Sequence, residues 1–311
     1  MTILDELRWR GLFADCTDLD ALTKRLSEGP ITLYAGFDPT ADSLHVGNLV
    51  PLFALRRFQL HGHHPIALAG GSTGMIGDPS GKSDERNLLT PDQLARNLDG
   101  IRPQLAQFLD FEVRSNPARL VNNYDWTAPI GVLEFLRDIG KHVSVNSMVA
   151  KDSVRVAHWR RGTRGSAMPS SATCCSRAST SITCARPTAA SCRSAPPDQW
   201  GNITVGTELT RRKLGATVWG LVFPLLTKAD GTKYGKTAEG AVWLDPKRTS
   251  PYRFYQFFVN ADDADAGKLL RTLTFLEREE IEGLEACAPG RPRRSRRSEG
   301  AGPRAHEARP R

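Results

Sequence analysis

The sequence predicts an α/β domain with a doubly wound parallel sheet. Residues 31–38 and 64–71 are short apolar stretches of strand length, and each runs directly into a loop rich in Gly, Pro or Asp. Residues 216–227 have the same apolar character. Strands that alternate with helical segments favour a parallel sheet covered on both faces. Ligands of such sheets bind beyond the carboxyl ends of the strands.

The first helix is expected over residues 4–28. Asp5 and Glu6 put negative charge near its start, where the helix dipole favours acids. The apolar stripe of this helix consists of Leu7, Leu12 and Leu22.

Two further helices follow from apolar spacing and capping signals. Residues 43–62 read as a helix with Ser43 as a possible N-cap. Residues 90–109 begin another, in which Thr90 and Gln93 have the spacing of a capping box. Strand-and-loop structure is expected at 111–116 and 118–126. The buried stripe of the second helix is expected to comprise Leu49, Leu52, Phe53 and Leu60.

Length and composition indicate a cytoplasmic globular protein. The chain has 311 residues, of which 40% are hydrophobic and 24% charged, and these values suit one large or two smaller domains. We find no apolar run of signal-peptide or membrane-span character in the sequence. A reducing compartment argues against a disulfide framework.

The net charge of +8 comes from two segments only. Residues 157–197 contain six arginines and no acid, and residues 288–311 contain eight arginines and two glutamates. Each segment therefore contributes +6, which leaves −4 for the rest. Overall basicity gives no support to a nucleic-acid-binding function for the patterned part of the chain.

A first polar cluster, "YAGFDPTADSLHVGN" at 34–48, follows the first strand. Asp38 and Thr40 lie on the connecting loop. His45 and Asn48 are three residues apart and should share a face of the next helical turn. Unpaired N–H groups at such a turn suit phosphate, although an incidental surface histidine is the simpler explanation when the cluster is taken alone.

A second cluster, "AGGSTGMIGDPSGKS" at 69–83, follows the second strand. It lacks the P-loop spacing because residue 76 is Ile, and it lacks G-x-G-x-x-G. Asp78 stands near the strand end, and Lys82 and Arg86 could face a polyphosphate together. The alternative without a function is a flexible surface loop.

A third cluster, "KADGTKYGKTAEG" at 228–240, is a polar, mobile-looking loop. Lys233 and Lys236 flank a glycine, with Thr237 beside them. Two such lysines could stabilise charge on a departing pyrophosphate. A solvated loop is the usual explanation of K-x-x-K on its own.

Taken together and in this order, the clusters resemble bacterial tyrosyl-tRNA synthetases. "HVGN" resembles the HIGH motif of the class I aminoacyl-tRNA synthetases, with Asn48 in place of its second histidine, and "KYGKT" resembles their KMSKS loop. "GDPSGKSDERNLL", "DQWGNITVGTEL" and "FPLLTKADGTKYGKT" are similar to that family too. The resemblance covers about 1–156 and 198–286.

The resemblance implies a Rossmann-like catalytic domain at 1–227. It implies a KMSKS-type loop with the start of a helical, truncated anticodon-binding domain at 228–287, and an aberrant tail at 288–311. The expected reaction joins L-tyrosine and ATP, with Mg2+, into tyrosyl-adenylate and then transfers tyrosine to tRNA(Tyr). A homodimer and a cytoplasmic location are implied as well. A tryptophanyl-type synthetase or an inactive RNA-binding remnant are the alternatives.

The family resemblance also assigns roles to individual residues. His45, Asn48 and Thr40 would contact the ATP phosphates, and five residues would hold the leaving pyrophosphate: Lys82, Arg86, Lys233, Lys236 and Thr237. Tyr34 and Asp78 would bind tyrosine, Gly36, Asp38 and Asp198 would serve the amino-acid and nucleotide ends, and Gln199 would lie near the adenylate.

Residues 157–197 interrupt the resemblance, and we interpret them as translated out of frame and disordered. The codons of 171–180, read one nucleotide upstream, can spell FSYMLLQGFD, and those of 189–195 can spell GCELQVG. Both are peptides of the kind that the family carries there. A zinc site is a poor alternative, since Cys174, Cys175, Cys184 and Cys192 form no C-x₂₋₄-C pair, and no metal ligands are expected. A disordered linker is the other reading.

Overall fold

The computed structural model describes residues 1–76, 89–142, 190–195, 200–229, 231–237 and 240–286. Its centre is a six-stranded sheet in the order β1-β6-β5-β2-β3-β4. The strands are β1 (Asp15–Cys16), β2 (Thr32–Phe37), β3 (His64–Ala69), β4 (Arg119–Asn122), β5 (Ala190–Ala195) and β6 (Trp219–Val222). All neighbours pair in parallel except β1, which is antiparallel to β6.

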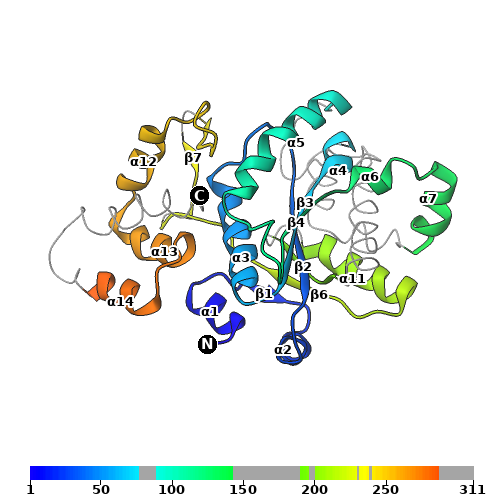
Figure 1. The fold of residues 1–311 in the computed structure, drawn as a ribbon, viewed down its shortest axis with the longest axis horizontal. Coiled ribbons are helices and arrows are strands. Elements are labelled where there is room, and N and C mark those ends of the chain that lie inside the picture. The colour runs from blue at the N-terminus through cyan, green and yellow to red at the C-terminus, as the bar shows by residue number, and fades with distance from the viewer. Residues whose placement is uncertain (77–88, 143–189, 196–199, 230, 238–239, 287–311) are drawn as a thin grey trace, which may run out of the picture.

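Helices cover both faces of this sheet (Figure 1). Helix α3 (Leu49–Leu60) lies on one face and α11 (Trp200–Leu214) on the other. The predicted doubly wound α/β class is therefore confirmed. The other helices of the domain are α1 (Ile3–Trp9), α2 (Leu19–Ser27), α4 (Gly71–Ile76), α5 (Pro91–Ala106), α6 (Tyr124–Thr127), α7 (Val132–Asp138) and the 3-10 turns η1 (Val46–Asn48) and η2 (Gly140–His142).

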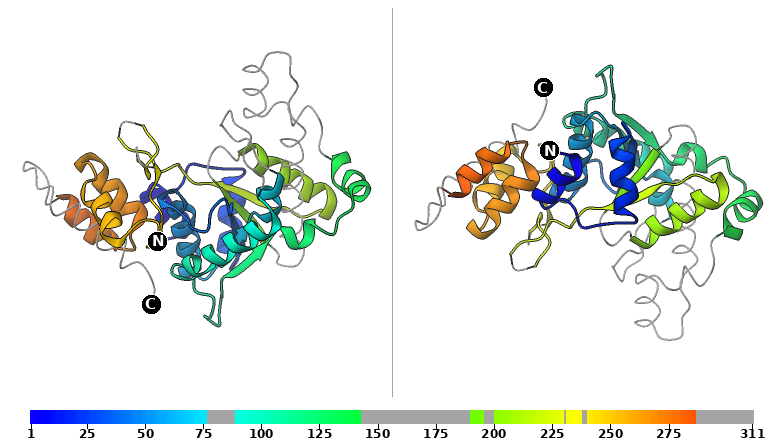
Figure 2. Two further views of the ribbon diagram at one scale, coloured as in Figure 1. Left: turned by 90° about the horizontal axis from the view of Figure 1, so that it is seen from above. Right: turned by 90° about the horizontal axis from the view of Figure 1, so that it is seen from below.

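A helical unit at 251–286 stands beside the sheet domain, next to α1 and α3 (Figures 1 and 2). It consists of α12 (Pro251–Val259), α13 (Asp263–Leu273) and α14 (Arg278–Ala286). A small antiparallel pair, β7 (Lys236–Thr237) and β8 (Gly240–Ala241), precedes it.

The predicted helix 4–28 is wrong as a single element. Helix α1 ends at Trp9 with Arg10 as its C-cap, and Gly11 follows with φ +70°, a conformation that glycine adopts without strain. Asp18 then caps α2 by accepting a hydrogen bond from the Ala21 N–H. The intervening β1 instead completes the sheet edge beside β6.

The second predicted helix also begins later than expected. Ser43 does not cap α3, because its hydroxyl donates to the Leu44 carbonyl and to Gln104 Oε1. His45 caps the η1 turn, and α3 starts only at Leu49. Helix α3 is buried on almost every side between the sheet and α13, so it has no single apolar stripe. Leu60, in its last turn, is 60% exposed rather than buried.

Two other predictions have different outcomes. The capping box at α5 is confirmed, since Thr90 and Gln93 exchange side-chain and backbone hydrogen bonds. The strand-and-loop structure expected at 111–116 and 118–126 has its strand, β4, in the second segment, and 111–116 contains none. There the Asp110 carboxylate accepts the N–H groups of Glu112 and Val113, and these bonds hold the chain in a turn.

Strand β5 lies inside the segment that we expected to be disordered, so that expectation is wrong for residues 190–195. Thr32, Leu33, Tyr34 and Ala35 of β2 pair with it on one side, and residues 219–222 of β6 pair with it on the other. The edges of β2 and β6 that face each other carry N–H and C=O groups that need partners. Any segment that can pair with them through its main chain is therefore favoured there. The rest of 157–197 and the tail 288–311 lie outside the described residues.

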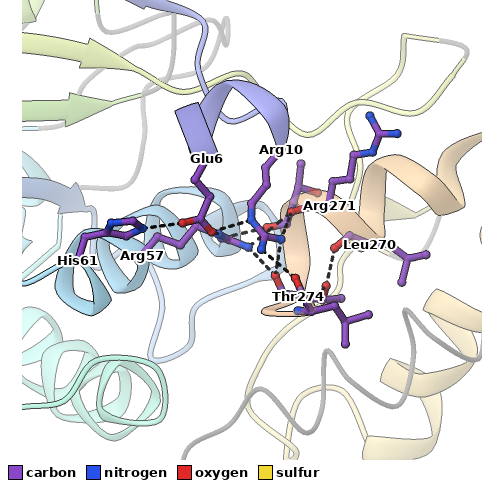
Figure 3. A network of polar contacts seen from close by, with 9 residues as sticks. Glu6, Arg10, Arg57, His61, Leu270, Arg271 and Thr274 are labelled. Atoms are coloured by element: carbon purple, nitrogen blue, oxygen red, sulfur yellow. Dashed lines mark hydrogen bonds and ion pairs between the residues drawn. The ribbon is translucent and has the colours of Figure 1, made fainter. Parts of the chain in front are cut away.

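A buried polar network joins α1, α3 and α13 (Figure 3). Arg57 is 1% exposed, and its guanidinium donates to main-chain carbonyls at the end of α13, including that of Thr274. Glu6 lies between Arg10, at 2.8 Å, and Arg57, at 3.3 Å. Burial alone would raise the pKa of Glu6, but the His61 hydrogen bond and the two arginines outweigh it and lower that pKa.

Candidate active site at the carboxyl ends of the strands

Strands β2, β3 and β4 end at one edge of the sheet, and polar residues follow each of them. The Gly70 N–H donates to the Phe37 carbonyl at 2.9 Å, and the Asn123 N–H donates to the Ala69 carbonyl at 3.1 Å. These bonds hold the three strand ends side by side. Asp38, Gly70 and Asn123 are consequently neighbours at the place where such sheets bind ligands.

Asp38 is oriented by the start of α4. Thr73 Oγ1 donates to Asp38 Oδ1 at 3.2 Å and to the Gly70 carbonyl at 2.9 Å. A Cβ atom at Gly70 would overlap the Asp38 carboxylate and stand 2.6 Å from Thr73 Oγ1. Glycine is required here because the carboxylate occupies the space of a side chain.

Helix α5 holds the loop that follows Asp38. Asn97 Nδ2 donates to the Pro39 carbonyl at 2.9 Å, and the buried Gln104 accepts the Leu44 N–H at 2.8 Å. Within the loop, the Thr40 N–H donates to the Asp38 carbonyl, while Thr40 itself is exposed. The loop therefore has a defined path from β2 to η1.

His45 and Asn48 share one turn, as their spacing predicts. His45 Nδ1 accepts the Gly47 N–H at 3.0 Å, and Asn48 Oδ1 accepts the His45 N–H at 3.0 Å. Because Nδ1 is the acceptor, the neutral imidazole carries its proton on Nε2. Nε2–H is then the donor that this turn can direct toward a phosphoryl oxygen.

The third cluster lies against this turn. A Cβ at Gly235, whose φ is +85°, would stand 3.1 Å from Val46 Cβ and 3.6 Å from the Gly47 nitrogen. The Val46 N–H donates to the Val242 carbonyl at 2.9 Å, which joins the two segments. The His45 turn and the Lys233–Lys236 segment are therefore adjacent in space although they are far apart in sequence.

The loop of this cluster is less open than its polar sequence suggests. Lys233 is exposed and pairs with Thr227 in an antiparallel bridge, but the following Tyr234 is buried. Lys236 and Thr237 form the backbone of β7 opposite Gly240 and Ala241. The centre of the loop is therefore packed against the rest of the protein, unlike the solvated loop that K-x-x-K alone suggests.

An apolar wall adjoins the polar strand ends. Tyr34, Ile66 and Leu68 form a buried cluster against which Val121 and Trp126 pack. Gly36 lies on the same pair of strands, and a Cβ there would be 3.9 Å from Leu68. The wall and the carboxylate of Asp38 together suit an aromatic ligand with a charged end.

Thr73 and Trp126 are candidates that sequence reasoning missed. Thr73 orients Asp38, and Trp126 belongs to the apolar wall. Trp126 Nε1 and Ser72 Oγ are buried without a hydrogen-bond partner in the described part of the chain. The sequence signal that could have found them is that "STG" and "YDW" begin within three residues of the ends of two strands.

Several expected residues remain untested by this geometry. Asp78, Lys82, Arg86, Asp198 and Gln199 lie outside the described residues. Within the described ranges, no group of three or more His, Cys, Asp or Glu side chains could hold a metal ion. No described helix has the length and apolar character needed to cross a bilayer.

Comparison with known proteins decides the family. The model of the class I tRNA synthetases for tryptophan and tyrosine matches residues 26–164 and 197–299. The chain belongs to this synthetase family. The family match breaks off and resumes at nearly the limits of the segment that we interpret as displaced in frame.

Relatives within this synthetase family favour its tyrosine branch. The chain is 64% identical over 296 residues to a tyrosine–tRNA ligase of Opitutus terrae, and the match covers 94% of this chain and 68% of the relative. It is 53% identical to that of Roseiflexus castenholzii, with the same coverage. These named relatives confirm the expected resemblance to bacterial tyrosyl-tRNA synthetases, and the tryptophanyl alternative is not favoured.

Solved synthetase structures have the same fold. A C-terminally truncated mitochondrial tyrosyl-tRNA synthetase of Aspergillus nidulans superimposes with a TM-score of 0.87 at 25% identity, over 99% of this chain and 89% of that one. A tyrosyl-tRNA synthetase of Archaeoglobus fulgidus gives 0.71 at 15% identity, over 99% of both chains, and shows the fold alone.

Proposed function

We propose that this chain carries the site of a tyrosine–tRNA ligase, which activates L-tyrosine with ATP and passes it to tRNA(Tyr). The observation that supports this most is the contact of Gly235 with the Val46–Gly47 turn. Because of this contact, the His45 turn and the Lys233–Lys236 segment are neighbours. A polyphosphate that lies there would meet both.

The ATP end of the site comprises the η1 turn and the lysine loop. His45 and Asn48, with Thr40, contact the phosphates in this proposal, and Lys233, Lys236 and Thr237 hold pyrophosphate as it leaves, together with Lys82 and Arg86. Mg2+ enters as the counter-ion of ATP, since it binds phosphates with few protein ligands. The protein contributes positioning and charge stabilisation rather than covalent chemistry.

The tyrosine end uses the apolar wall and the strand-end carboxylates. Tyr34 and Asp78 bind the substrate side chain, and Trp126 lines the wall. Gly36, Asp38, Asp198 and Gln199 serve the amino-acid and nucleotide ends. A pocket that hydrogen-bonds a phenol rejects phenylalanine strongly, because phenylalanine would leave a buried polar group of the pocket unpaired.

The composition of β5 supports the displaced reading frame. A central parallel strand is normally a near-continuous run of Val, Ile or Leu, yet Ala190–Ala195 reads ASCRSA. Arg193 stands opposite Tyr34 on one side and Gly220 on the other. The displaced frame would put leucine at 192 and valine at 194.

The same displacement predicts weak tyrosine activation by this chain. The peptide FSYMLLQ at 171–177 is the one that resembles the family's substrate helix, and it is absent here. Each lost buried hydrogen bond costs about 1–3 kcal/mol. Loss of core packing lowers the free energy of unfolding, which is only about 5–15 kcal/mol for a typical domain.

Tyrosine-dependent exchange of pyrophosphate into ATP tests the proposed function. We expect negligible exchange from the unaltered chain. We expect tyrosine-dependent exchange, and none with tryptophan, when codons 157–197 are read one nucleotide upstream. Equal exchange with tryptophan would contradict the proposed substrate, and normal exchange by the unaltered chain would contradict the proposed defect.

An RNA-binding remnant remains a second candidate because of the arginine-rich tail. Binding that falls steeply with salt and disappears on deletion of residues 288–311 would favour it. We favour the ligase over this candidate, because the arginines of the tail would vanish if the reading frame were restored. Cytoplasmic location stays a prediction.

We also infer that the protein pairs with a second copy, as the family resemblance implies. Helix α7 exposes Val132, Leu133 and Leu136, and Leu133 is 83% exposed. Large apolar side chains on one helix are typical of an interface. Sedimentation equilibrium should show a dimer that Leu133→Glu converts to monomer; a monomer before substitution would refute the pairing.

A further inference from the structure

Between the two loop lysines the chain is buried rather than solvated. Tyr234 is 5% exposed and belongs to the main hydrophobic core. The exposed Lys233 precedes it, and Gly235 and Lys236 follow. A solvated phosphate-binding loop has no need of a buried aromatic residue at its centre.

The residues that bury Tyr234 come from the helical unit. Its ring centroid lies 5.2 Å from that of Phe257 at an interplanar angle of 76°, and 6.5 Å from that of Phe258. Both phenylalanines belong to α12. Burial, followed by the charge of Asp265 on α13, raises the pKa of Tyr234, so the phenol is neutral at physiological pH. We call the edge-to-face pair of Tyr234 and Phe257 the aromatic anchor.

A second contact fixes the base of the same loop. Lys268 Nζ on α13 donates to the Thr227 carbonyl at 2.7 Å and to Thr227 Oγ1 at 3.1 Å. Thr227 in turn pairs with Lys233. On its other side the loop meets the His45 turn through Gly235. The loop is thus held between α12 and α13 on one side and the nucleotide end of the sheet on the other.

We propose that Tyr234 is a positioning residue, which uses the aromatic anchor to set Lys233 and Lys236 relative to the His45 turn. This inference rests on the proposed function, because it concerns the lysines that hold pyrophosphate. It goes beyond that function in making α12 a determinant of ATP binding. Tyr234 itself need not touch substrate. Small displacements of positioned charges weaken binding and rate strongly.

The test compares Phe257→Leu with a matched control, Phe254→Leu. Phe254 lies on the same helix and is buried, but its ring contact is with Phe258 at 5.2 Å. Both variants lose one ring of equal size from α12. A general loss of packing would therefore affect both, whereas loss of the anchor affects Phe257→Leu alone. Tyr234→Phe keeps the ring and serves as the conservative variant.

Two readouts are measured on the full chain. Hydrogen exchange of a peptide spanning residues 231–237 should speed up by about tenfold in Phe257→Leu and change little in Phe254→Leu and Tyr234→Phe. Titration with Mg-ATP should show affinity falling by about tenfold in Phe257→Leu and staying within about twofold in the other two.

Each outcome of these measurements supports or overturns the role of the aromatic anchor. Equal changes in the two phenylalanine variants, or none in Phe257→Leu, would overturn the role of the anchor. Faster loop exchange without a change in Mg-ATP affinity would show that the anchor does not position the lysines, which also overturns the proposal. If the unaltered chain binds no Mg-ATP, the proposed nucleotide site fails, and loop exchange alone still decides whether the anchor holds the loop.

Discussion

Arg57 of α3 donates a hydrogen bond to the main-chain carbonyl of Thr274, just beyond the end of α13. The same guanidinium lies 3.3 Å from the Glu6 carboxylate. Burial, with the nearby charge of Arg10, lowers the pKa of Arg57 to about 9, so the group stays charged at neutral pH. One buried cation therefore joins the helical unit to the sheet domain (Figure 3).

Arg57→Met should destabilise the protein by about 3–5 kcal/mol, because it removes one of the two arginines that pair with Glu6 and the guanidinium that donates to the Thr272 and Thr274 carbonyls. Urea unfolding measures the difference in free energy. Arg56→Met is the matched control, since the half-buried Arg56 bonds Gln59 on its own helix, and it should cost less than about 1 kcal/mol. Similar losses in the two variants would contradict this role of Arg57.

Stability should fall as the pH falls from about 6.5 to about 4 because of His63. Burial, with neighbouring basic groups, lowers the pKa of His63 from 6.5 to about 4. In this window the unfolded chain binds a proton that the folded chain does not, so acid favours unfolding, on the order of 2 kcal/mol in total.

His63→Asn supplies the comparison. An asparagine oxygen can accept the Ile31 N–H in place of His63 Nδ1, and it does not titrate. The unfolding free energy of this variant should be lower at pH 7 but flatter between pH 4 and 7. A slope as steep as that of the unaltered chain would assign the pH dependence to other groups.

Gly70→Ala should weaken Mg-ATP binding, because the new methyl group would displace the Asp38 carboxylate and Thr73. The overlap should also cost about 1–3 kcal/mol of stability. Calorimetric titration measures the affinity. Gly131→Ala is the control, since its Cβ would meet no atom within 4 Å. Unchanged affinity in Gly70→Ala would remove Asp38 from the site.

Gln104→Met should loosen the loop that carries His45. The Leu44 N–H and the Ser43 hydroxyl would lose their acceptor, Gln104 Oε1. A buried donor left unpaired costs about 1–3 kcal/mol. Hydrogen exchange of the Leu44 amide should increase, and Gln107→Met at the end of the same helix should leave it unchanged. An unchanged Leu44 amide in Gln104→Met would show that α5 does not hold the loop.

Predictions from residue spacing were correct where the interacting residues are close in sequence. The capping box at Thr90 and Gln93 and the shared turn of His45 and Asn48 involve residues three apart, and both follow from spacing. The same kind of reasoning failed at residues 4–28. There the break at Gly11 and the pairing of β1 with β6 depend on a strand about two hundred residues away.

The site was predictable in its parts but not in its assembly. Strand ends indicated Asp38 and His45, yet nothing in the sequence shows that Gly235 lies on Val46 or that Tyr234 inserts beside Phe257. Strand β5 carries no strand pattern at all, and its place follows from the open edges of β2 and β6. Long-range packing overrides local propensity in all three cases.

The nucleotide sequence across codons 157–197 tests the central claim most directly. We predict that the frame one nucleotide upstream spells FSYMLLQGFD at 171–180 and GCELQVG at 189–195, without a stop codon between them. A stop codon or unrelated peptides in that frame would contradict the displaced frame, and β5 would then be an authentic strand of unusual composition.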